Sequence, residues 1–482
     1  MTALACQIGR TLRDMLSAAG TVDPSSTSSR HLVTPAVLGS LHVHVVLTGL
    51  LRPASESIPV SHINAPSNDQ GHRCSPARCP GGEGSSDTRP HLDAQRRSSS
   101  TAATAATAFH VHVGAENTGL LKVPQTADVA RKVTELLQKD IDTHHCFFNN
   151  DGFHNHIVHH MLSLYGTGAA AADIQFAYDQ NKTYQRPLSR PHDHIAEHLA
   201  SWPEALKYMG SPKYYPDLFV YFRGEMDELG WQEALKKHLF AGTERSDDML
   251  QRMFSDPRSV RGRGADPALR RHVAEGEPSN TTRLTRDGIE DSAPFVARVR
   301  IAEDELEERT AEMMQAALWL AAAATMHPPN VPRFDFSSCD HHINLAPIFL
   351  TINAQPWIPT AQKIRILEWK IRINLINWLA VGAPPQDFYK ALDYGPENRS
   401  PAMSPEELLP KFFRVDDDGH TIKLVRATLL CREQLRKYAD KPWVRIQGDD
   451  RWLRLAHLWL MPPWTPREIG GCATPGLIPH GR

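Results

Sequence analysis

The residues of this sequence best suited to chemistry are histidines. Of the 25 in the chain, six lie in one short run, residues 144–160. His156 and His160 are four residues apart, so a helix places them on one face, and His159 lies three from His156. Imidazoles on a buried helix face bind a metal or transfer protons, or they are polar core residues satisfied by hydrogen bonds. The spacing leaves both interpretations open.

This run is itself predicted to form a helix. Asn150 or Asp151 is a suitable N-cap, and Gly166 is a typical residue at which a helix stops. The apolar residues at helical spacing form a stripe next to the histidines, and they are Ile157, Met161 and Leu164. The histidines are therefore expected at the border of the core.

Two further groups of this kind occur later in the chain. His341 and His342 are adjacent, and His420 lies three residues before Lys423 in a segment that residues 416–418 can cap. A buried lysine with a depressed pKa acts as a base, or it takes up carbon dioxide to form a carbamate, which is an oxygen ligand. The alternative is a capped surface helix with a solvated Lys423.

Several histidines and one oxygen donor from separate helices suit a non-haem iron centre with open positions for dioxygen. Zinc would accept the same atoms. The sequence has no Walker loop, no GxSxG elbow, no HExxH and no GxGxxG after a predicted strand. We therefore expect neither a Rossmann-bound flavin nor a serine nucleophile.

The composition narrows the class of protein. The 482 residues carry a formal net charge of −2, which gives no general attraction to nucleic acid or acidic membranes. The seven cysteines are scattered and odd in number, so a reducing compartment is expected rather than a disulfide framework. No run approaches the ~20 apolar residues that span a bilayer. We expect a soluble, cytoplasmic protein.

The chain divides by composition and hydrophobic periodicity into helical and irregular parts. Residues 1–105 are rich in Pro, Ser, Thr and Arg and are expected to be mostly disordered. Residues 106–461 are expected to form one large helical domain, interrupted by an irregular, disordered insertion at 255–293. Residues 462–482 are expected to be a loose tail.

The predicted fold class is mainly α. Helical periodicity recurs along the domain, and no segment shows the alternation typical of strands. A loop rich in proline is expected at 396–410. The predicted helices are residues 126–141, 173–181, 202–206, 215–228, 231–240, 302–325, 334–352, 360–381, 420–438 and 450–460.

Several of these segments resemble the questin oxidase-like family. The resemblance covers residues 106–254 and 294–461. The matching segments are 119–124 (GLLKVP), 144–168 (HHCFFNNDGFHNHIVHHMLSLYGTG), 178–185 (YDQNKTYQ), 417–427 (DDGHTIKLVRA) and 448–457 (GDDRWLRLAH).

The resemblance implies an oxygenase of fungal-type aromatic polyketide metabolism that opens an anthraquinone-like ring. The reaction would be Baeyer–Villiger-like and linked to NADPH, or an iron-dependent ring cleavage. His420 and Lys423 match the DDGHxxK element of the family and are the expected catalytic residues. His341 matches the histidine of its DFxxMH element. The expected ligands of a non-haem iron are His156, His160, His341, His420 and Lys423.

The sequence departs from the family pattern at two places. Residues 256–263 are rich in arginine where an HPxIHxGYGxEF-like segment is usual, and residues 337–340 replace apolar residues before His341. If the lost histidines are ligands, metal binding is weakened; a splicing error in the sequence would look the same.

Three functions therefore remain open. They are a ring-opening oxygenase with dioxygen and an aromatic polyketide as partners, a helical hydrolase that uses zinc and bound water, and a helical binding protein without catalysis. Aromatic residues that could line a pocket are Phe148, Tyr165 and Trp378, although core packing is an equally good role. Convergence of the histidine groups on one place would separate an enzyme from a scaffold.

Overall fold

The structure is a computed structural model. It describes residues 106–149, 154–254, 296–323, 326–327, 331–332, 340–380, 388–393 and 403–460. The sequence-based expectations for residues 1–105, 255–293 and 462–482 concern residues outside this described part of the chain.

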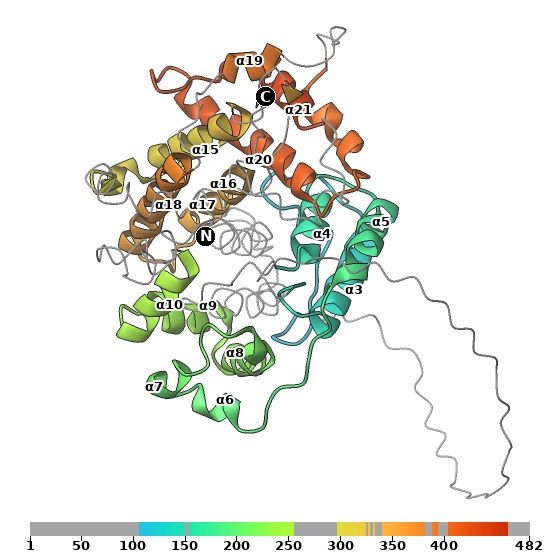
Figure 1. The fold of residues 1–482 in the computed structure, drawn as a ribbon. Coiled ribbons are helices and arrows are strands. Elements are labelled where there is room, and N and C mark those ends of the chain that lie inside the picture. Colours follow the sequence, from blue (N-terminus) through green and yellow to red (C-terminus); the bar gives the residue numbers. More distant parts are fainter. Residues whose placement is uncertain are drawn as a thin grey trace, which may run out of the picture. The chain divides into compact units, whose positions relative to one another are not determined.

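The described part of the chain is mainly α, as predicted (Figure 1). Its first helices are α3 (Ala127–Thr143), α4 (Ile157–Gly166) and α5 (Ala171–Asn181), which pack against one another. Thr126 caps α3 through its side chain, which accepts from the backbone of Val129. The predicted stripe of Ile157, Met161 and Leu164 is fully buried.

A run of shorter helices follows. The elements are η1 (Lys182–Tyr184), α6 (Ile195–His198), α7 (Trp202–Ala205), η2 (Pro212–Tyr214), α8 (Tyr215–Leu229), α9 (Trp231–Leu235), the π-helix η3 (Lys236–Phe240) and α10 (Glu244–Phe254). Gly230, with φ of +78°, separates α8 from α9, as the sequence predicts.

The C-terminal half supplies the longest helices and a minimal sheet. The elements are η4 (Glu303–Glu305), α15 (Leu306–Ala323), β1 (Met326–His327), β2 (Val331–Pro332), α16 (Asp340–Leu345), α17 (Ile348–Asn353), α18 (Thr360–Ala380), α19 (Phe388–Asp393), η5 (Pro405–Phe412), α20 (His420–Leu435), η6 (Arg436–Tyr438) and α21 (Asp449–Leu458). β1 and β2 form one antiparallel pair.

Two sequence predictions need correction here. The helix expected over residues 334–352 is two helices, α16 and α17, because Pro347 cannot donate the backbone hydrogen bond that would continue α16. The loop expected over 396–410 ends in the 3₁₀-helix η5. Its first turn is capped by Ser404, whose backbone N–H donates to the Glu407 carboxylate.

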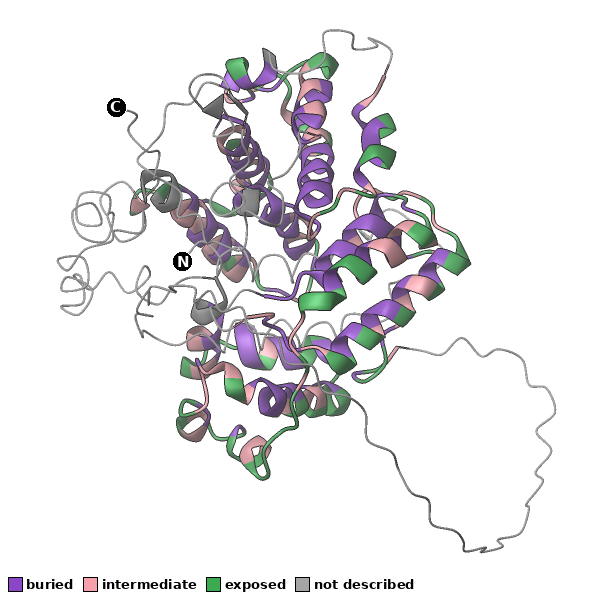
Figure 2. Ribbon diagram, turned by 45° about the vertical axis from the view of Figure 1, so that its right-hand side comes forward, coloured by how far each residue is buried: buried purple, intermediate pink, exposed green. Residues whose placement is uncertain are grey.

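α20 lies at the centre of the described core. It packs against α4, α15, α16 and α21, and almost every residue from His420 to Cys431 is buried. Figure 2 shows the contrast with most other helices, which carry buried residues on one side and exposed residues on the other. The Trp459 indole donates to the Thr428 hydroxyl inside this core.

No helix in the described part of the chain combines the length and the apolar character that crossing a membrane requires.

The start of α4 differs from the sequence prediction. The helix begins at Ile157 rather than near Asn150, and Asn155 caps it by accepting from the backbone N–H of Ile157 at 2.8 Å. The amide of Asn155 also donates to both oxygens of the buried Asp140, at 2.9 and 3.1 Å. An isolated antiparallel bridge pairs Phe147 with His154 just before the helix, and the predicted caps Asn150 and Asp151 lie outside the described residues.

This double role of Asn155 predicts a large effect of its removal. Asn155→Ala should lower the free energy of unfolding by about 2–3 kcal/mol, since it removes a cap worth about 1 kcal/mol and leaves the buried Asp140 carboxylate with His144 as its remaining side-chain partner. Thr126→Ala, which removes only the cap of α3, is the matched control and should cost about 1 kcal/mol. Equal losses in urea unfolding would show that the contact with Asp140 contributes nothing.

Candidate active site

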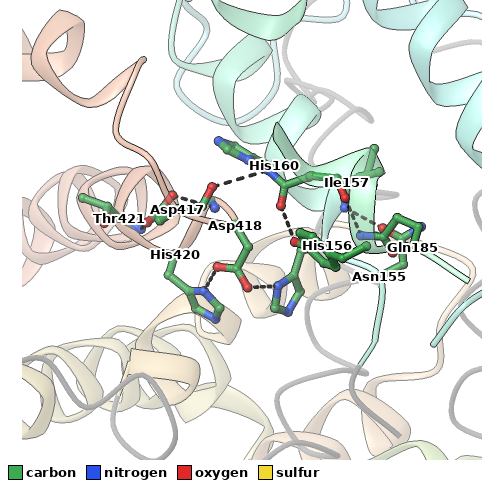
Figure 3. Close-up of polar contacts among 12 residues, drawn as sticks. Asn155, His156, Ile157, His160, Gln185, Asp417, Asp418, His420 and Thr421 are labelled. Atoms are coloured by element: carbon green, nitrogen blue, oxygen red, sulfur yellow. Dashed lines mark hydrogen bonds and ion pairs between the residues drawn. The ribbon is translucent and has the colours of Figure 1, made fainter. Parts of the chain in front are cut away.

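Two of the three predicted histidine groups meet at one partly buried carboxylate. His156, at the N-terminus of α4, and His420, the first residue of α20, both direct Nδ1 at Asp418. Each nitrogen contacts a different oxygen of that carboxylate. Figure 3 shows the two rings on either side of Asp418, and their centroids are 4.8 Å apart. The site therefore joins residues that are 262 positions apart in the sequence.

These three residues are the group in the described chain whose ligand atoms come close enough to hold a metal. One ligand atom from each of His156, Asp418 and His420 lies within 4.8 Å of the others. Two imidazoles and a carboxylate are the donor set of the facial triad that binds iron(II) in non-haem oxygenases. The donor chemistry thus fits the metal that the sequence analysis expects.

The charges in the site depend on one another. Burial raises the pKa of Asp418, but His156 and His420 outweigh burial and hold that pKa well below its usual range. Burial lowers the pKa of His156 far below the ordinary value, and Lys423 lowers it further, against the opposing effect of Asp418. Asp418 is therefore a carboxylate at neutral pH, which is the form that binds a metal.

Lys423 is part of this site, not of a surface helix. Its side chain is fully buried, and its positive charge lowers the pKa of both His156 and His160. The alternative of a solvated lysine on an exposed helix is therefore wrong. The physical reason is that α20, despite its polar start, is enclosed by α4, α15 and α16.

The capping of α20 is as predicted and shapes the site. The Asp417 carboxylate accepts from the backbone N–H groups of Gly419 and Thr421, at 2.7 and 2.8 Å. Gly419 has a φ of +87°, and a Cβ placed there would lie 2.5 Å from Cγ of His160. A glycine is thus required at position 419 for two reasons, which are the left-handed backbone and the close approach of α4.

The remaining predicted ligands lie around this group. His160 is buried against Gly419, but its nitrogens are not among the ligand atoms that meet at Asp418. The side chain of His341 is outside the described residues. Its neighbour His342 is buried, with Nδ1 at 3.1 Å from Nζ of Lys370. The helix that carries both, α16, packs against α20.

Sequence reasoning missed Asp418 as a site residue. It regarded residues 416–418 as helix caps, and Asp417 does serve that purpose. The signal for Asp418 was its place two residues before His420, which lets one carboxylate reach both imidazoles. A cap and a ligand-binding carboxylate look alike in sequence, and only the approach of α4 separates their roles.

The aromatic residues proposed for a pocket have different surroundings. Phe148 lies edge-on to Tyr184, with centroids 5.2 Å apart, and 6.4 Å from the ring of His156. Tyr165 is a core residue whose hydroxyl donates to the Gly114 carbonyl at 2.7 Å. The side chain of Trp378 is outside the described residues. Phe148 is thus the one described aromatic of the three that is placed beside the site.

The fold and this site define a helical protein with a two-histidine, one-carboxylate group, and comparison with known proteins gives its family. The family model for questin oxidase-like proteins matches residues 153–257 and 262–428, which include all the site residues above. The chain belongs to the questin oxidase-like family. The match also includes residues 262–293, which the sequence analysis regards as an insertion.

Named relatives agree with this assignment. The chain is 28% identical over 405 residues to the Baeyer–Villiger monooxygenase dmxR6 of Cryptosporiopsis sp. (strain 8999), covering 70% of this chain and 90% of the relative. It is 26% identical over 391 residues to the questin oxidase of Aspergillus fumigatus (strain ATCC MYA-4609 / CBS 101355 / FGSC A1100 / Af293), covering 67% and 86%. It is 26% identical over 417 residues to the Baeyer–Villiger oxidase ptaJ of Pestalotiopsis fici, covering 73% and 93%. The chain is an oxidoreductase, which decides against the hydrolase.

The packing of Gly419 on His160 gives a prediction. Gly419→Ala should lower the free energy of unfolding by about 1–2 kcal/mol for the left-handed backbone and a further 1–3 kcal/mol, roughly, for the clash with His160. Gly448→Ala is the matched control, because Gly448 has a φ of +82° with open space where its Cβ would lie. Urea unfolding of both variants measures the difference. Equal losses would contradict the close packing of α4 on α20.

The buried neutral histidines predict the pH dependence of stability. Burial lowers the pKa of His145 and His238 to about 4 and that of His160 to about 3. In the unfolded chain these histidines have a pKa near 6.5. Their contribution to the free energy of unfolding is therefore fully present above that pH and is lost as the pH falls towards 4. At pH 5.5 each of these histidines should cost on the order of 1 kcal/mol. A urea midpoint that is unchanged or higher at pH 5.5 than at pH 7.5 would contradict this.

Proposed function

We propose that this protein is an oxygenase that opens a ring of an anthraquinone-like aromatic polyketide, with dioxygen as the oxidant and a non-haem iron ion as the metal. The observation that carries the proposal is the meeting of the buried His156 and His420 at the partly exposed carboxylate of Asp418. A scaffold or binding protein has no need to gather two buried imidazoles at one carboxylate, since burying such polar groups costs free energy. The names of the relatives supply the class of substrate.

In this proposal the three residues hold the metal, and the rest of the site keeps them in place. A bound iron(II) ion supplies the electrons that activate dioxygen. Asp418 stays ionised because two imidazoles face it, and it fixes the orientation of both rings. His341 remains a predicted further ligand on α16, the helix next to α20.

Lys423 has a separate proposed role. A fully buried ammonium beside two histidines opposes the binding of a cation, because like charges repel strongly where water is excluded. If the neutral amine takes up carbon dioxide, a nitrogen–carbon bond forms, a proton is released and the residue becomes an anionic oxygen donor. We propose that Lys423 acts in this form as an additional ligand.

The number of electrons that must be supplied distinguishes two possible reactions. Insertion of one oxygen atom beside a ring carbonyl, with the second atom leaving as water, requires two electrons, which NADPH would supply. Incorporation of both atoms during ring cleavage requires no external reductant. We propose the second course, in which NADPH is not consumed, because the sequence lacks a GxGxxG motif after a predicted strand for a flavin that would pass on its electrons.

The proposal is tested by the metal content of the purified full chain. Wild-type protein loaded anaerobically with iron(II) should retain close to one ion per chain, and His420→Ala and Asp418→Asn should weaken retention by roughly 100-fold or more. His192→Ala is the control. It removes a histidine–carboxylate contact with Asp217 outside the site and should bind iron as the wild type does.

Consumption of an anthraquinone under oxygen, with and without NADPH, is measured on the same samples. Iron retained equally by all variants would contradict the assigned ligands. Turnover that depends strictly on NADPH would contradict the cleavage without external reductant, while leaving the metal site intact.

A further inference from the structure

One segment of the chain touches the site without being part of the metal group. Residues 178–185 form the end of α5 and the turn η1, and Asn181 is buried where they approach α4 and α20. Its side-chain nitrogen lies 3.4 Å from Nδ1 of His160 and 3.4 Å from the carbonyl oxygen of Asp417. One amide thus contacts α4 and the loop that leads into α20.

The orientation of this amide is fixed by its other contacts. Its nitrogen donates to the carbonyl of Ala177 at 2.9 Å, and its oxygen accepts from the Tyr184 hydroxyl. Since a carbonyl can only accept, the group that faces Ala177, and therefore His160, is the NH₂ group. The positions of the amide nitrogen and oxygen are therefore assigned from their hydrogen-bond partners.

It follows that Nδ1 of His160 faces a donor, whereas Nδ1 of His156 and of His420 faces a carboxylate. A neutral imidazole has one nitrogen with a proton and one without. A doubly protonated ring would direct an N–H at the NH₂ group of Asn181, so this contact itself requires an unprotonated Nδ1 and a neutral His160. A neutral His160 that accepts at Nδ1 carries its proton on Nε2.

We propose that Asn181, held by Tyr184, is a positioning residue that fixes His160 as the tautomer with its proton on Nε2. His160 is then a hydrogen-bond donor to a bound molecule and not a metal ligand. Gly419 contributes by packing on the ring, which opposes the flip that would exchange Nδ1 with Cδ2.

The proposed role of His160 follows from the chemistry of a donor in a dry site. A fixed N–H group stabilises negative charge on oxygen where no water competes for it. A quinone carbonyl or a phenolate of the substrate develops such charge during ring opening. This last step rests on the proposed function, whereas the tautomer of His160 is a property of the protein alone.

The tautomer is measured directly by ¹⁵N NMR of the full chain labelled at histidine. Chemical shifts distinguish a ring nitrogen with a proton from one without, and the signals that vanish in His160→Gln identify His160. In the wild type we expect the proton on Nε2. In Asn181→Asp the new carboxylate accepts at the same place, so the proton should move to Nδ1.

Gln180→Glu is the matched control. It makes the same amide-to-carboxylate change at the neighbouring, exposed position of α5, and it should leave the signals of His160 unchanged. If Asn181→Asp does not fold, Asn181→Leu serves instead. It removes the NH₂ group that faces Nδ1 and should leave His160 as a mixture of tautomers.

Activity and metal content give an independent readout. Asn181→Asp should lower kcat roughly 100-fold, the usual effect of losing one such donor, with iron retention unchanged. A wild-type proton on Nδ1, or an unchanged tautomer in both variants, would overturn the proposal. Loss of iron in Asn181→Asp would also overturn it, because His160 would then behave as a ligand. Failure of the proposed function would show as absent iron with the expected tautomer.

Discussion

The site depends on one constraint, which is that the charge of the Asp418 carboxylate, whose side chain is only 28% exposed, must be paired. A charge that is largely withdrawn from water is tolerated when partners replace the water that it has lost. His156 and His420 are those partners, and each approaches a different oxygen. Because one imidazole comes from α4 and the other from α20, the need to pair Asp418 fixes how these two helices meet. The arrangement for which we propose a metal is a consequence of the same contact.

Several surrounding contacts hold the N-termini of α4 and α20 in place. Asp140 and Asn155 determine where α4 begins, and Asp417 caps the start of α20. Gly419 allows the close approach of His160, and Gly166 lies near Arg426 one to two turns further along both helices. α4 and α20 therefore run in the same direction, with the site at their beginnings. The burial of α20 on its other sides makes this geometry rigid.

Much of the fold could be predicted from the sequence, because the helices are long enough for their apolar periodicity to be clear. α3, α8, α15 and α18 all lie close to where the pattern places them. The errors in the predicted helix boundaries occur where a second structural factor overrides the local sequence pattern. Asn150 is a good cap in isolation, but α4 begins only at Ile157, after the bridge between Phe147 and His154, and the Asn155 side chain accepts from the N–H of Ile157. Pro347 divides a segment that periodicity alone reads as one helix.

The site could be predicted in part. The abundance of histidines pointed to His156 and His420, and the structure brings them together. Two features required contacts between distant parts of the chain. Asp418 looks like another capping residue until α4 is placed beside it, and the helical face shared by His156 and His160 does not show that Asn181 holds His160 in a different role. Spacing gives the face of a helix, but the partner of each nitrogen depends on tertiary packing.

The central claim is that a metal binds where His156, Asp418 and His420 meet. The most direct measurement is an anomalous difference map, recorded at the iron absorption edge, from crystals of the full chain grown or soaked anaerobically with iron(II). We expect a single strong peak in contact with Asp418 and both imidazoles. A peak at another position, or none in crystals whose solution contains excess iron(II), would contradict the account.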